Sequence, residues 1–150
     1  MDNVKTFSKI LEETGHLAYI TRGFSMLPLL RQGKDVVVIE KKEERYRKYD
    51  TVLFQRGNGS YVLHRILKVL DDGYWIVGDN CISGENVKDN QILGIMTSVK
   101  RNGKTINVTD WKYLLYVHLW CDIYPLRFLI LRIKRFVFRC IRFVKRRVFG

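Results

Sequence analysis

Hydrophobic and polar positions follow two different periods along the chain. Four apolar residues near its start recur at helical spacing: Val4, Phe7, Ile10 and Leu11. Gly15 follows them, so the pattern predicts an amphipathic helix over residues 3–14. Beyond it, β-branched and aromatic residues predict strands over 16–22, 35–40, 50–56 and 61–69.

Turn-forming residues separate several of these strands. Asn58 lies within a glycine-rich connection at residues 57–60, and the pairs Asp72-Gly73 and Asn102-Gly103 mark two further hairpins. The hairpins add strands over 74–77, 92–100 and 104–108. We therefore expect a mainly β, antiparallel fold in which residues 1–110 form one domain.

From Trp111 onward the pattern returns to a helical period, and residues 111–150 are predicted to form a separate basic amphipathic tail. The basic residues of one predicted face are Arg135, Arg139, Arg142 and Arg146. The apolar residues of the opposite face are Ile133, Phe136, Val137, Cys140, Ile141, Val144 and Val148. The stretch from Tyr113 to Leu131 is interrupted by polar residues, which argues against a membrane span.

The net charge of +12 is concentrated in this tail. Residues 111–150 contain ten Lys or Arg and one acid, which gives +9 there and leaves +3 for residues 1–110. A basic face beside large aliphatic and aromatic side chains favours an anionic membrane surface over nucleic acid. Two other interpretations remain open, a helix folded back on the β domain and a nucleic-acid-binding arm.

The cysteines and the N-terminal residues bear on possible cofactors and on the cellular location. Cys81, Cys121 and Cys140 are odd in number and have no paired spacing, so neither a disulfide framework nor a metal site is predicted, and no cofactor is expected. The first fourteen residues include acids and lack a long apolar stretch. This pattern is not that of a secretory signal and predicts that the first domain lies on the cytoplasmic side. Together with the basic tail, it predicts a membrane-associated protein on that side.

Three short segments carry residues suited to catalysis. Ser25 lies in a Gly- and Pro-containing connection, His64 lies in a predicted strand, and Asp79 lies in a Gly-Asp-Asn turn. Taken one at a time, they are typical of a turn serine, a structural histidine and a turn aspartate. Their order and spacing carry more information than each residue alone.

Together the segments resemble the signal peptidase I superfamily, whose catalytic core is shared with LexA-like repressors. The resemblance covers about residues 19–99. It rests on the segments 25–28, 35–38, 50–53, 64–66, 78–80 and 92–94. The main bacterial branch has a lysine as general base, whereas His64 stands here, as in the branch of endoplasmic reticulum, archaeal and some Gram-positive enzymes. The resemblance implies Ser25 as nucleophile and His64 as general base.

The chemistry of such a pair can be stated from the residues. A neutral imidazole can accept the serine proton as the oxygen attacks a carbonyl, and the Ser25 backbone N–H is the candidate oxyanion donor. Gly23 stands where many relatives have a second hydroxyl donor. The resemblance places the acid that orients His64 in or after the Gly-Asp-Asn segment. Asp79 is the first candidate, Glu85 the second, and Asp89 the third.

We expect an extended peptide to bind by strand addition, with Met26 and Pro28 beside the nucleophile as substrate contacts. The resulting prediction is a serine endopeptidase that cleaves a leader or signal segment from a peptide or protein. A peptide exporter is a further candidate partner. The competing hypothesis is a catalytically silent binding or regulatory protein whose basic tail contacts membrane or nucleic acid. A LexA-like regulator needs a DNA-binding head, for which one short N-terminal helix is insufficient.

Overall fold

The computed structural model describes residues 6–148, without the side chains of residues 124–126, 143 and 145–148. Its first helix, α1, covers Phe7–Thr14 and ends at Gly15, whose left-handed backbone forms the C-cap. The predicted helix start at residues 3–5 lies outside the described residues, as do the side chains of Arg146 and Val148.

Eight strands within residues 6–148 form one antiparallel sheet, which confirms the predicted fold class. The strands are β1 His16–Ile20, β2 Val36–Glu40, β3 Thr51–Gln55, β4 Tyr61–Leu70, β5 Gly73–Val77, β6 Glu85–Val87, β7 Ile92–Arg101 and β8 Lys104–Asn107. Their order is β1-β2-β7-β3-β4-β5-β6, and β8 pairs with β7. Strand β6 was not predicted, because three residues are too few to show a period-2 pattern.

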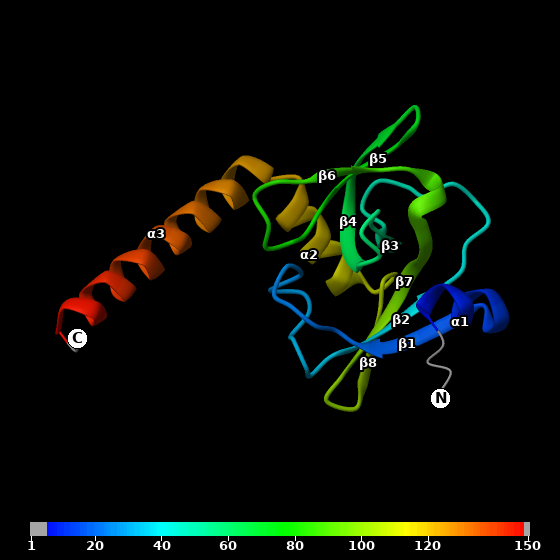
Figure 1. Ribbon diagram of the computed structural model, residues 1–150, viewed down its shortest axis with the longest axis horizontal. Helices are drawn as coiled ribbons and strands as arrows, with labels where there is room; N and C mark the ends of the chain where they lie inside the picture. Colours follow the sequence, from blue (N-terminus) through cyan, green and yellow to red (C-terminus); the bar gives the residue numbers. More distant parts are fainter. Residues whose placement is uncertain (1–5, 149–150) are drawn as a thin grey trace.

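The strands enclose two hydrophobic cores. The larger core contains Leu11 of α1, Val37 of β2 and Leu53 of β3, and the smaller contains Phe54, Ile66 and Tyr74. Adjacent residues of β3 therefore face different cores, because successive side chains point to opposite faces of a strand. Helix α1 packs beside β1 (Figure 1).

The predicted tail divides into two helices with different surroundings. Helix α2, Trp111–Cys121, buries Tyr113, Val117 and Cys121 in the larger core. Helix α3, Tyr124–Val148, extends away from the sheet (Figure 1). The predicted domain boundary after residue 110 therefore cuts through a packed core. Of the three interpretations of the tail, a helix folded back on the β domain describes α2. Among the described helices, none is both long and apolar enough to cross a membrane.

Candidate active site

Ser25 lies in the long connection between β1 and β2, and that connection is closed by contacts at its ends. The N–H of Thr21 donates to the Asp35 carbonyl at 3.3 Å, and the N–H of Gly33 donates to the Thr21 carbonyl at 3.0 Å. The buried Asp35 carboxylate also binds the Arg31 and Arg101 side chains. These contacts hold the ends of the connection and so position Ser25.

His64 lies in β4, opposite Val52 of β3, with its ring near that of Phe54. The residue is only 7% exposed. Burial disfavours the charged imidazolium and lowers the pKa of His64 to about 4. The imidazole is therefore neutral at pH 7, which is the form that a general base requires.

Gly78 is the point at which Ser25 and His64 approach each other. A Cβ atom on Gly78 would lie 2.7 Å from the Ser25 carbonyl oxygen and 2.8 Å from His64 Nε2. The close approach therefore requires glycine, since a side chain here would push apart the segments that carry Ser25 and His64. The next residues secure the same contact: the Asn80 N–H donates to the Ser25 carbonyl at 2.7 Å, and the Asn80 amide donates to the Phe24 carbonyl at 3.0 Å.

Ser25 and His64 also line the same cavity, which has a volume of about 1160 Å³. One wall comes from edge strand β1, through Tyr19 and Ile20, and another comes from β4. Of the two predicted substrate contacts, Met26 is 5% exposed and lines the cavity. Pro28 is exposed and does not line it, so this predicted contact is not part of the cavity.

The structure places Glu85 beside His64. Its Oε1 atom lies 3.7 Å from His64 Nδ1, a buried atom with no hydrogen-bond partner among the described residues. Glu85 is held by Arg56, whose Nε and guanidinium nitrogens donate to its two oxygens at 2.8 and 2.6 Å. These bonds lower the pKa of Glu85, so the carboxylate faces His64 as an anion.

Asp79, the first candidate for the orienting acid, has a different position. Its two oxygens accept hydrogen bonds from Arg65 at 2.9 Å each, and Tyr116 donates to one of them at 2.9 Å. Arg65 and Asp79 are both fully buried. Arg65 and Tyr116 thus occupy the Asp79 carboxylate, and Asp79 stabilises the turn at residues 78–81. Glu85 replaces it as the acid nearest His64 Nδ1. The third candidate, Asp89, accepts a hydrogen bond from Tyr74 at 2.6 Å on the side of the smaller core.

Two residues of the predicted tail also hold this turn. Trp120 of α2 donates from its indole N–H to the Asp79 carbonyl at 2.8 Å. Arg127 of α3, only 2% exposed, donates to the carbonyl oxygens of Gly78 and Cys81. The tail thus supports the site, and the sequence pattern missed both residues because their partners are backbone atoms more than forty positions away.

Two hydrogen-bond donors in the connection between β1 and β2 have no described acceptor. No described residue accepts a hydrogen bond from the Ser25 N–H, which leaves this donor free for a substrate carbonyl. Thr21, which the sequence analysis did not select, has a buried hydroxyl without a described partner and lines the same cavity. The arrangement thus combines a hydroxyl, a neutral imidazole, a nearby carboxylate and one potential oxyanion donor, which are groups that acyl transfer needs. Comparison with protein-family models and with curated proteins found no match for the chain.

Proposed function

We propose that this protein is a serine endopeptidase with Ser25 as nucleophile and His64 as general base. The observation that carries the proposal is the convergence of both residues on Gly78 at one cavity, with Glu85 at the far nitrogen of the imidazole. A buried imidazole that is neutral at pH 7, beside a serine in an open cavity, has a direct catalytic use.

In the proposed reaction, Ser25 Oγ attacks a peptide carbonyl while His64 Nε2 accepts the hydroxyl proton. The C–O bond forms as the carbonyl becomes an oxyanion, which the Ser25 N–H stabilises. His64 then donates the proton to the leaving amine, and the C–N bond breaks. Water hydrolyses the acyl-enzyme by the same steps. Glu85 stabilises the imidazolium that forms twice in each cycle.

A fluorophosphonate probe tests this assignment without knowledge of the substrate. We expect a covalent adduct on Ser25 Oγ, formed with loss of fluoride and transfer of the serine proton to His64. Because His64 has a pKa of about 4, the labelling rate should be nearly constant from neutral pH down to about pH 5 and fall below that. Mass spectrometry of the digested protein locates and quantifies the adduct.

The control is Ser60→Ala, which removes an exposed serine from the β3–β4 turn and should leave labelling unchanged. Ser25→Ala should abolish it. An adduct on another serine contradicts the proposed nucleophile. Absence of any adduct contradicts it as well and favours the silent binding protein.

We also propose that α3 attaches the enzyme to an anionic membrane surface, in accord with a location on the cytoplasmic side. One face of α3 consists of exposed apolar residues: Leu129, Ile130, Ile133, Phe136, Val137, Ile141 and Val144. No acid occurs in the α3 sequence, whereas basic residues flank the apolar face. An exposed apolar face with adjacent positive charge is typical of helices that lie in the interface of anionic bilayers.

Flotation with vesicles that contain phosphatidylglycerol checks this attachment. Replacing Ile133, Val137 and Ile141 together by aspartate should lower the bound fraction at least about tenfold, because it removes the apolar contact and adds repulsion. Val69→Asp, at an exposed valine of β4, is the matched control and should bind like the unmodified protein. Equal flotation of the triple variant would remove the membrane proposal.

A further inference from the structure

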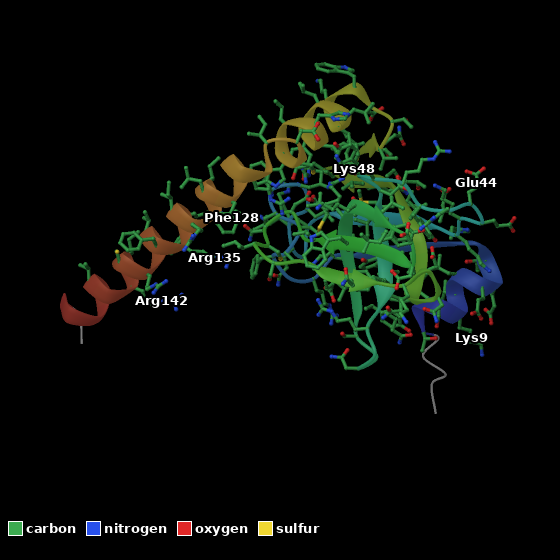
Figure 2. All side chains as sticks on the ribbon, turned by 90° about the horizontal axis from the view of Figure 1, so that it is seen from above. Lys9, Glu44, Lys48, Phe128, Arg135 and Arg142 are labelled. Atoms are coloured by element: carbon green, nitrogen blue, oxygen red, sulfur yellow. The ribbon has the colours of Figure 1, made fainter. Side chains whose placement is uncertain are left out.

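A second groove lies on the other side of the catalytic loop. Its volume is about 660 Å³, and it is bounded by Phe24 and Leu27 of the loop, by Asn80, and by α3. The helix contributes four cationic side chains to it: Lys134, Arg135, Arg139 and Arg142. Figure 2 shows Arg135 and Arg142 on the same side of α3.

The charge of this groove is uncompensated. Among the described residues, no acid lines it, and none of its four cations forms an ion pair. Four like charges on one helix face repel each other, and a bound anion relieves that repulsion. Leu131 and Phe138 add apolar surface between the cations. The groove therefore fits a ligand that carries both negative and apolar groups.

The groove is joined directly to the catalytic segments. Asn80 lines the groove, and its backbone and side chain donate to the carbonyl oxygens of Ser25 and Phe24. Arg135 is close enough to Cys81, which lines the catalytic cavity, for its charge to oppose the burial-induced rise in the pKa of that thiol. A chain bound in the groove therefore lies next to the cavity that holds Ser25.

We infer that this groove binds an acidic, extended segment of the polypeptide substrate beside the catalytic cavity. The inference rests on the proposed peptidase function and adds a substrate class to it. Arg135 and Arg139 are separated by about 6 Å along the helix axis. Alternate residues of an extended chain are about 6.6 Å apart on one side. Acidic residues at alternate positions can thus face the cations, while apolar residues between them face Phe24 and Leu27.

A peptide segment fits this position better than a lipid headgroup. The apolar face of α3, with Ile133, Val137 and Ile141, lies on the opposite side of the helix from Arg135, Arg139 and Arg142, as their spacing requires. When the apolar face contacts a bilayer, the groove cations point away from it and toward the catalytic loop. The ligand nearest to them is then the chain that enters the active site.

Fluorescence anisotropy with the Ser25→Ala chain measures this binding without cleavage. The probes are two labelled octapeptides, one of alternating glutamate and leucine and one of alternating glutamine and leucine. We expect the acidic peptide to bind at least about tenfold more tightly. Arg135→Gln, Arg139→Gln and Arg142→Gln combined should remove most of this difference, and added salt should weaken binding of the acidic peptide.

The matched control replaces three exposed lysines of the β domain, Lys41, Lys68 and Lys104, by glutamine and should bind within about twofold of the parent. Equal binding of the two peptides, or unchanged binding by the arginine variant, overturns the inference. If the triple arginine variant loses binding to phosphatidylglycerol vesicles but keeps its binding to the acidic peptide, the cations are assigned to lipid. This result also overturns the inference. If the acidic peptide binds through these arginines but Ser25 is never labelled, the peptidase proposal fails while the groove assignment stands.

Discussion

Replacing Ser25 by alanine is expected to lower kcat/KM for peptide cleavage by at least about 10⁴-fold, because the proposed acyl-enzyme forms on the Ser25 hydroxyl. His64→Ala should have an effect of similar size, since the serine hydroxyl then loses its proton acceptor. The double variant should be no worse than either single variant, because the two residues act as a unit. Initial rates on a peptide library, followed by mass spectrometry, provide the measurement.

Two further variants make this experiment specific. Glu85→Gln should lower kcat less than Ser25→Ala or His64→Ala does. Glu85 lies 3.7 Å from His64 Nδ1, and its carboxylate also binds Arg56. Ser60→Ala should cleave at the normal rate. If Ser25→Ala retained more than about one hundredth of the activity, the nucleophile would have to be another group.

Arg65→Met is expected to reduce the free energy of unfolding by about 3–5 kcal/mol, a large part of the stability of a small domain. The substitution leaves the Asp79 carboxylate buried without its cationic partner, and among the described side chains Tyr116 alone continues to donate to it. It also removes the donors to the Tyr49 carbonyl and the Tyr113 hydroxyl. Urea denaturation followed by fluorescence or circular dichroism measures the loss.

Another bidentate arginine–carboxylate pair, Arg56–Glu85, provides a matched control. Its side chains are 42% and 31% exposed, so Arg56→Met should reduce stability by no more than about 1 kcal/mol. Combining Arg65→Met with Asp79→Leu should recover part of the loss, because it removes the unpaired buried charge. An Arg65→Met protein as stable as the Arg56→Met protein would contradict this account of the buried pair.

The site shows how far residue order carries a prediction. Ser25 and His64 were selected because the order of their segments resembles a known family, and in the structure both lie beside Gly78. Residue order did not identify the acid that orients His64. Asp79 and Glu85 are both acids shortly after a strand, and their roles depend on which arginine reaches each one. Arg65 precedes Asp79 by fourteen residues and Arg56 precedes Glu85 by twenty-nine, and no local pattern encodes these pairings.

The alternation of apolar and polar residues determined the strands, and the turn residues determined the hairpins, because both depend on neighbours in sequence. The basic and apolar faces of α3 follow from the helical period in the same way. Only the tertiary structure decided that Glu85 faces His64, that α2 completes the larger core, and that Arg127 and Trp120 hold the turn at residues 78–81. These are contacts between segments distant in sequence, and burial and hydrogen bonding select them after the chain has folded.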